Sequence, residues 1–224
     1  MTLRIVVLLS GSGSNLQAIL NACGQGQDQS PAIPPAAPLA ARVVGVLSNR
    51  ADAFGLIRAQ QAGVDTAVLG HGNFPDHNSF DAAMANIIDA WEPDIVVLAG
   101  FMRILSADFV TRYSGRLLNI HPSLLPKYKG LHTHQRALDA SDSEHGCSVH
   151  FVTPELDGGP VIAQAVVGVK ADDTAESLAA RVHAAEHSVY PAVLGWLAEQ
   201  RLSLQQDQVV LDGEPLLTPY RYSA

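Results

Sequence analysis

One stretch near the start of the chain has the composition of a phosphate-binding loop. Residues 10–15 read Ser-Gly-Ser-Gly-Ser-Asn and lie between an apolar run and a helical pattern. Glycines at such a turn let backbone N–H groups approach a phosphate at the positive end of a helix. Neither GxxxxGK[ST] nor GxGxxG is matched, and only one short anion cradle is visible, which favours a monophosphate over ATP or a dinucleotide. The alternative is a tight turn in which Ser14 or Asn15 merely caps the helix.

A second stretch, NIHPSLLP at residues 119–126, places an amide and an imidazole close together. If this segment begins as a strand, Asn119 and His121 are two residues apart and point to the same side. They would then lie at the carboxyl end of a strand, where α/β sheets bind ligands. An amide N–H and a protonated imidazole are both donors, suited to the oxyanion that forms when a nucleophile adds to a carbonyl. The alternative is a pair of polar residues that closes a loop.

A third candidate is Asp157, within the sequence ELDGGP. The two glycines allow a sharp turn that could present the carboxylate inward. A carboxylate near an imidazole raises the pKa of the ring and can relay protons, directly or through water. Asp-Gly is also common in surface turns, and nothing in the spacing shows that Asp157 meets His121. Their meeting would have to come from the fold.

Other nucleophile and metal chemistries are less well supported. The chain has nine histidines, and His132 and His134 are spaced HxH, but there is no HExxH and no cysteine partner, so we expect no metal site. Cys23 and Cys147 lie outside any CxxC motif, which predicts two reduced thiols. Ser123 has no GxSxG context and is not expected to be a nucleophile.

The elements that must position these residues alternate along the chain. Continuous apolar runs, typical of parallel strands covered on both faces, occur at residues 4–9, 42–47 and 94–99. Helical patterns occur at residues 15–22, 53–62, 79–90 and 107–113. Asp52 and Ser106 are capping candidates for two of them. This alternation predicts an α/β fold with a doubly wound, mostly parallel, Rossmann-like sheet and right-handed crossovers, in one domain over residues 1–224.

The remaining segments predict further strands, a loop and a long helix. Residues 117–120 read as a strand, followed by a stretch at 121–134 that is too polar and too interrupted to be core. Residues 146–152 and 161–169 suggest a β-hairpin, residues 174–199 a long closing helix, and the tail short strands around an LDGEP turn. Pro31, Pro34, Pro35 and Pro38 predict an exposed loop within residues 23–41.

Composition limits the possible partners. The 224 residues are 47% hydrophobic and 16% charged, which indicates a globular protein. The net charge of −8 argues against a broad contact with nucleic acid. The apolar runs are far shorter than the roughly 20 residues of a membrane span, and the N-terminus does not resemble a signal peptide. We therefore expect a soluble, cytoplasmic enzyme without nucleic-acid or membrane partners.

Blocks along nearly the whole chain carry a family resemblance. They read SGSGSNLQAI, SNRADAFGL, VVLAGFMRIL, LLNIHPSLLPKYKGLHTHQRAL, HGCSVHFVTPELDGGPVIAQ and EHSVYP. The chain resembles the phosphoribosylglycinamide formyltransferase family of folate-dependent formyltransferases. The resemblance implies a Rossmann-like formyltransferase fold and the transfer of a formyl group from 10-formyltetrahydrofolate to the amine of glycinamide ribonucleotide, in de novo purine (IMP) biosynthesis. It also implies that 10-formyltetrahydrofolate is a cosubstrate and that no metal takes part. The oligomeric state is left open between a monomer and a homodimer.

The resemblance also implies residue roles. Asn119, His121 and Asp157 would be catalytic: Asn119 and protonated His121 would hold the oxyanion, while Asp157 orients His121 and a water that moves the proton. The substrate-binding residues, for the phosphate and the ribose or glycinamide portion, would be Gly13, Ser14, Asn15 and Glu186. The folate-binding residues would be Met102, Arg103, Ile104, Leu105, Asn119, Thr153, Pro154, Glu155, Leu156 and Asp157. On this basis residues 1–115 would form a phosphate-binding half, and residues 116–224 a catalytic and folate-binding half.

Three features depart from the family pattern. The Pro- and Ala-rich stretch near residues 25–40 is longer than usual, and we expect deletion of residues 27–38 to leave turnover largely intact. His77 stands where relatives generally carry an arginine near the folate, so the cation there would be weaker and pH-dependent. Lys129 replaces the usual proline of KYPG, which would loosen that loop.

Other formyl-handling enzymes fit the chain less well. A methionyl-tRNA formyltransferase needs a further C-terminal domain and a basic face, and a formyltetrahydrofolate deformylase carries an additional N-terminal domain. The alternative from a different class is a nucleotide-binding module that has lost turnover, against which the intact Asn119, His121 and Asp157 argue.

Overall fold

The computed structural model describes residues 2–26 and 37–223. Eight strands form one sheet in the order β11-β7-β6-β5-β4-β1-β2-β3. Their bounds are β1 (Leu3–Leu9), β2 (Ala41–Ser48), β3 (Asp65–Val68), β4 (Ile95–Leu98), β5 (Leu117–His121), β6 (Glu144–Phe151), β7 (Val161–Gly168) and β11 (Tyr220–Tyr222). Strands β3, β2, β1, β4 and β5 run parallel, and β11 runs parallel to β7. Strand β6 is antiparallel to both of its neighbours.

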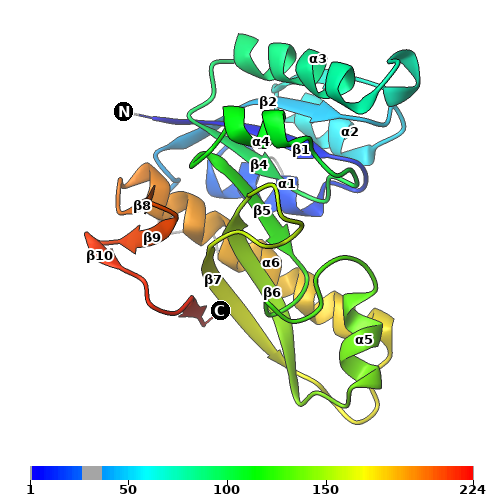
Figure 1. Ribbon diagram of the computed structural model, residues 1–224, viewed down its shortest axis with the longest axis vertical. Coiled ribbons are helices and arrows are strands. Elements are labelled where there is room, and N and C mark those ends of the chain that lie inside the picture. Colours follow the sequence, from blue (N-terminus) through cyan, green and yellow to red (C-terminus); the bar gives the residue numbers. More distant parts are fainter. Residues whose placement is uncertain (1, 27–36, 224) are drawn as a thin grey trace.

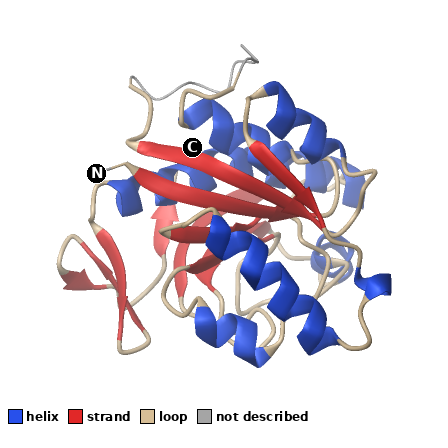
Figure 2. Cartoon of the chain, turned by 90° about the horizontal axis from the view of Figure 1, so that it is seen from above, coloured by secondary structure: helices blue, strands red, loops and turns tan. Residues whose placement is uncertain are grey.

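Helices cover both faces of this sheet (Figures 1 and 2). Their bounds are α1 (Ser14–Ala22), α2 (Phe54–Gln61), a short 3-10 helix η1 (His71–Asn73), α3 (His77–Ala90), α4 (Ala107–Arg112), α5 (Thr133–Asp139) and α6 (Ala175–Ala198). Alternate residues of β1 enter two separate cores. Ile5 and Val7 pack with α1, α2 and α6, whereas Val6 and Leu8 pack with α3 and α4. The two cores explain why the sequence of β1 is apolar without alternation.

The predicted α/β class with a mostly parallel sheet is confirmed. The long closing helix is also confirmed: α6 begins after Thr174, whose side chain forms a capping box with Ser177, and ends at Ala198. The predicted hairpin is formed by β6 and β7. In the tail, β8 (Leu202–Gln205), β9 (Gln208–Leu211) and β10 (Glu214–Pro215) form a small separate sheet.

Several local predictions were wrong or incomplete. Asp52 does not cap α2, whose N-cap is Ala53 without a side-chain bond, because the Asp52 carboxylate pairs with Arg50 instead. The edge strand β3 and the short helix α5 were not predicted. The stretch at 121–134 is partly core, since Ser123 and Leu125 are buried. Its polar groups are satisfied internally: the Ser123 hydroxyl donates to the Lys127 carbonyl over 2.6 Å.

The predicted Pro-rich loop is described only at its ends. Residues 27–36, which include Pro31, Pro34 and Pro35, lie outside the described residues. On the near side, the Gln25 side chain bonds to both backbone groups of Val43, and on the far side Leu39 donates to the Ala22 carbonyl. The near end of the loop is thus bonded to β2, and the far end is bonded to α1.

Candidate active site

A cavity of about 1070 Å³ lies at the carboxyl ends of the central strands. Its walls come from the loops after β1, β4 and β5, from the 130–134 segment, from the loop before β7, and from α6. In an α/β sheet this edge is where adjacent loops diverge and leave a crevice for ligands. The cavity therefore draws together segments from both halves of the chain.

The loop after β1 forms one wall of this cavity as residues 11–15. Gly13, with φ of 70°, is the N-cap of α1 and makes no side-chain cap bond, so neither Ser14 nor Asn15 acts as the cap. A Cβ on Gly13 would lie 2.5 Å from the Gly55 Cα, so a side chain is excluded there. The first N–H groups of α1 are thus left for a ligand, as an anion site at a helix N-terminus requires.

Asn15 and Glu186 join this loop to α6. The Asn15 amide donates to the Glu186 carboxylate over 2.9 Å, while the Asn15 Oδ1 is buried without a partner among the described residues. Glu186 is 4% exposed, and burial raises the pKa of its carboxyl, opposed by the Asn15 hydrogen bond. Both residues line the cavity.

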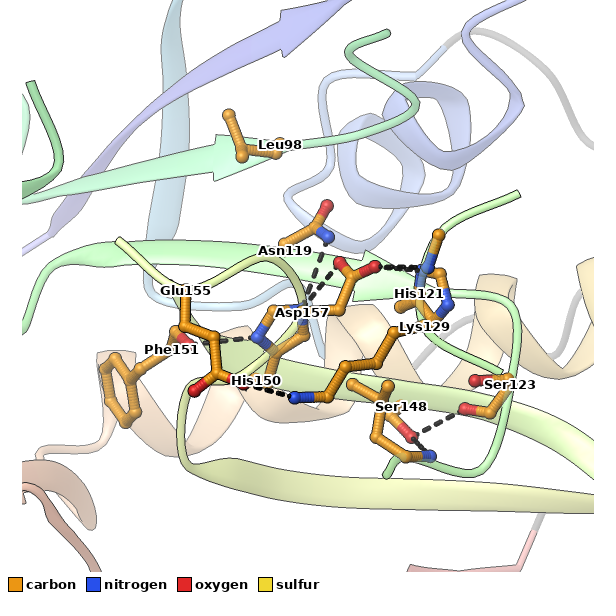
Figure 3. Close-up of polar contacts among 12 residues, drawn as sticks. Leu98, Asn119, His121, Ser123, Lys129, Ser148, His150, Phe151, Glu155 and Asp157 are labelled. Carbon is orange, nitrogen blue, oxygen red and sulfur yellow. Dashed lines mark hydrogen bonds and ion pairs between the residues drawn. The ribbon is translucent and has the colours of Figure 1, made fainter. Parts of the chain in front are cut away.

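The predicted catalytic side chains converge from two segments (Figure 3). Asn119 and His121 project from β5, and Asp157 comes from the turn that precedes β7. The His121 Nδ1 lies 3.4 Å from the Asp157 Oδ2, and both side chains are less than a tenth exposed. Asp157 has φ of 47°, an uncommon conformation for a residue other than glycine. Its Oδ2 also accepts the Gly130 N–H over 2.9 Å, which fixes the carboxylate beside the ring.

Hydrogen bonds define the proton positions on His121. Its Nε2 lies 2.9 Å from the Tyr128 carbonyl oxygen, which can only accept, so Nε2 carries a proton and donates it. The Nδ1 is then the atom that faces Asp157. A proton on Nδ1 as well would give an imidazolium paired with the Asp157 carboxylate, a state whose positive charge can stabilise a developing oxyanion.

His150 on β6 orients the Asn119 amide, and sequence reasoning did not assign it this role. The His150 Nδ1 donates to the Phe151 carbonyl over 2.9 Å, which leaves its Nε2 as an acceptor for the Asn119 Nδ2 at 3.3 Å (Figure 3). One Asn119 N–H is thereby used, and the other remains for a ligand. Burial lowers the pKa of the His150 ring, which keeps the ring neutral and able to accept.

The residues predicted to bind folate fall into two groups. Met102, Arg103, Ile104 and Leu156 line the cavity, as do Asn119 and Asp157, while Leu105, Thr153, Pro154 and Glu155 do not. Leu105 instead packs against the core beneath α3 and α4, and Glu155 pairs with Lys129 over 2.7 Å. Met102 and Ile104 are 72% and 66% exposed, so the first group presents an uncovered apolar wall. The folate-binding role of both groups stays a prediction.

Two histidines beside the cavity contact each other, and one of them, His134, belongs to the HxH pair considered above as a metal candidate. The His134 Nδ1 lies 3.1 Å from the His145 Nε2, and His134 lines the cavity. Burial lowers the pKa of both rings, to about 4 for His145. Within the part of the chain that the structure describes, no group of three or more His, Cys, Asp or Glu side chains is arranged to hold a metal ion. Elsewhere, the Nε2 of His77, the residue that stands in place of the arginine implied by the resemblance, lies 3.3 Å from the Oδ2 of the buried Asp81.

Comparisons with known proteins place this chain within a class of transferases. The chain belongs to the formyl transferase family, whose pattern matches residues 3–194. It is 52% identical over 222 residues to the phosphoribosylglycinamide formyltransferase of Escherichia coli, covering 99% of each chain. It is 44% identical to that of Haemophilus influenzae, covering 95% of each. The solved phosphoribosylglycinamide formyltransferase of Coxiella burnetii superimposes with a TM-score of 0.91 at 50% identity, with both chains covered completely.

The family likeness confirms the resemblance and the enzyme class expected from the sequence: the chain is a formyltransferase. No helix in the described ranges has both the length and the apolar character to cross a membrane. This likeness does not assign roles to individual residues.

Proposed function

We propose that the chain transfers a formyl group from 10-formyltetrahydrofolate to the amine of glycinamide ribonucleotide, as a step of de novo purine (IMP) biosynthesis. The observation that carries the proposal is the meeting of Asn119, His121 and Asp157 in the same cavity as the uncapped N-terminus of α1. The N-terminus of α1 can bind a phosphate. Asn119, His121 and Asp157, at a separate position in the cavity, can stabilise negative charge that develops on a carbonyl oxygen. The names of the relatives supply the substrate.

Each of the three side chains has a separate role in the proposed formyl transfer. The amine nitrogen attacks the formyl carbon, and the carbonyl electron pair moves to oxygen. The free N–H of Asn119 donates to this oxyanion, and the positive charge of a protonated His121 ring beside it stabilises the developing negative charge. Asp157 pairs with His121 and, through a water, takes the proton that the attacking nitrogen loses. When the carbon–nitrogen bond to the folate breaks, its N10 receives that proton and tetrahydrofolate leaves.

The binding surfaces follow the same geometry. Gly13, Ser14 and Asn15 hold the phosphate, and Glu186 binds the ribose or glycinamide portion. The apolar wall of Met102, Ile104 and Leu156 covers the pterin. Residues 1–115 supply the phosphate site and residues 116–224 the catalytic groups, although the apolar wall uses both halves. Function as a monomer or homodimer in the cytoplasm remains the prediction made from the sequence.

The test is formation of tetrahydrofolate by purified protein given glycinamide ribonucleotide and 10-formyltetrahydrofolate. His121→Ala and Asp157→Ala should each lower turnover by on the order of 100-fold. His71→Ala is the matched control, since His71 is exposed and does not line the cavity. Binding of the ribonucleotide without turnover in any sample would favour the alternative of a non-catalytic module.

The pH profile tests the assignment independently. A reaction that needs both a proton acceptor and a proton donor should give a bell-shaped dependence of turnover on pH. A flat profile between about pH 5 and 10 would contradict the role of His121 as a cation.

A further inference from the structure

Ser10 lies at the junction of two walls of the cavity. It follows the buried end of β1 and directly precedes residues 11–15, and it is 6% exposed. Its backbone N–H donates to the Gly100 carbonyl over 3.1 Å, and its hydroxyl lies against the segment that begins the apolar wall. The loop after β1 and the loop after β4 therefore meet at this one residue.

The two hydrogen bonds of the Ser10 hydroxyl have defined directions. Its oxygen accepts the Met102 N–H over 2.8 Å, and its proton goes to the Asn49 Oδ1 over 2.6 Å. A backbone N–H can only donate and an amide oxygen can only accept, so no other assignment satisfies both partners. Asn49, just after β2, thus keeps the Ser10 oxygen lone pairs turned toward Met102.

Phe101 and Leu105 anchor the loop after β4 in the core, and the Arg103 guanidinium lies 4.9 Å from the centroid of the Phe80 ring. The two side chains that form the apolar wall do not take part in this packing. Met102 and Ile104 are mostly exposed. At the far end of the loop, the Ser106 N–H donates to the buried Asp81 carboxylate over 2.6 Å. Ser10 and Asp81 therefore bind the backbone N–H groups at the two ends of residues 102–106. This loop presents the wall that, in the proposed function, covers the formyl donor.

The phosphate loop has separate supports. The Gly11 carbonyl accepts the Gly55 N–H over 3.1 Å, and the Ser12 carbonyl accepts from the Arg58 guanidinium over 3.0 Å. Both supports come from α2 and neither involves the Ser10 hydroxyl. Loss of that hydroxyl should loosen the backbone at Met102 in the loop after β4, the donor loop, and leave the phosphate loop in place.

We propose that Ser10, oriented by Asn49, is a positioning residue that holds the donor loop at a fixed place relative to the phosphate loop. This inference rests on the proposed function. Its consequence is selective: placement of the formyl donor against the amine depends on the Ser10 hydroxyl, whereas affinity for the ribonucleotide does not. Small displacements between two reacting groups lower the rate strongly, so kcat should respond as well as the KM of the donor.

The test compares Ser10→Ala, Asn49→Ala and the double variant in steady-state formyl transfer with both substrates varied. Ser10→Ala should raise the KM of the formyl donor and lower kcat, each about tenfold, with the KM of glycinamide ribonucleotide unchanged within about twofold. Asn49→Ala should shift the same two constants less. The double variant should match Ser10→Ala, because Asn49 acts only through the hydroxyl.

Thr174→Ala is the control for a general loss of stability, since it removes the cap of α6 and should shift none of the three constants. Ser10→Ala with wild-type constants, with equal changes in the KM of both substrates, or with effects that multiply with those of Asn49→Ala would overturn the inference while the proposed function stands. Absence of turnover in the wild type would overturn the proposed function, and with it this role of Ser10.

Discussion

The proposed phosphate loop and the proposed catalytic residues line one cavity but are built in different ways. The loop at residues 11–15 is one continuous segment that follows β1, a strand in the parallel part of the sheet. It offers backbone N–H groups at the start of α1. Asn119, His121 and Asp157 offer side chains and meet where β5 pairs with the antiparallel strand β6. A site made of backbone N–H groups needs residues without side chains that would block the ligand. A site made of side chains needs a fold that brings distant residues together. Substitutions should therefore affect binding in the first region and turnover in the second.

The largest effect is expected in the side-chain site. Asn119→Leu removes the N–H offered to the oxyanion and leaves the His150 Nε2 without its donor. We expect kcat to fall by on the order of 100-fold, while the KM of glycinamide ribonucleotide changes little. Steady-state kinetics with each substrate varied would measure both constants. A kcat within twofold of the wild type would show that the Asn119 amide does not stabilise the transition state.

The backbone site should respond in the opposite sense. Gly13→Ala places a Cβ 2.5 Å from the Gly55 Cα on a residue with φ of 70°, so the loop must shift. We expect the KM of the ribonucleotide to rise roughly 10- to 100-fold with kcat largely kept. Gly63→Ala is the matched control, because Gly63 has φ of 67° and a Cβ added there would meet no atom within 4 Å. If both variants raise this KM equally, the close approach to Gly55 is irrelevant to binding.

The two regions should also differ in how pH acts on them. Residues 11–15 carry no titratable side chain, whereas His145, 1% exposed, lies near the catalytic residues with a pKa lowered to about 4 by burial. Between pH 6.5 and 4 the unfolded chain binds a proton on this ring that the folded chain does not. The free energy of unfolding therefore falls as the pH drops through that window.

Urea unfolding at pH 7.5 and 5.0 measures this effect. The His145 contribution to the difference should be on the order of 2 kcal/mol, and His145→Gln should reduce the pH dependence. It should not abolish it, because burial also lowers the pKa of His134 and of His150. His71→Gln, an exposed control, should leave the dependence unchanged. An identical dependence in His145→Gln and the wild type would contradict the assignment.

The smallest effect concerns the contact between residues 11–15 and α6. Glu186→Gln keeps an oxygen that can accept from the Asn15 amide and removes the buried charge. We expect the KM of the ribonucleotide to rise less than about tenfold, with kcat unchanged. A kcat loss as large as that of Asn119→Leu would place Glu186 in the chemical step.

The same contrast explains how much the sequence could predict. The turn between β1 and α1 was predictable because its glycines lie close together in the chain, and β1, β4 and α6 because their apolar patterns are strong. Asp157 could be paired with His121 only by resemblance, since no local rule brings a turn before β7 to the end of β5. The role of His150 was missed because a histidine in an apolar strand gives no sign of which amide it will face. The small strand β3 was missed because it forms by pairing at the edge of the sheet. The cap of α2 was wrong because Asp52 forms an ion pair instead. Both interactions compete with local propensity.

The central claim is that Asn119, His121 and Asp157 act as one unit on the formyl carbonyl. The most direct test is the rate of formyl transfer by His121→Ala, Asp157→Ala and the double variant at saturating substrates. Groups that act together lose their effect together, so the double variant should be about as slow as the slower single variant. Losses that multiply in the double variant would show that the imidazole and the carboxylate act independently, and would contradict the account.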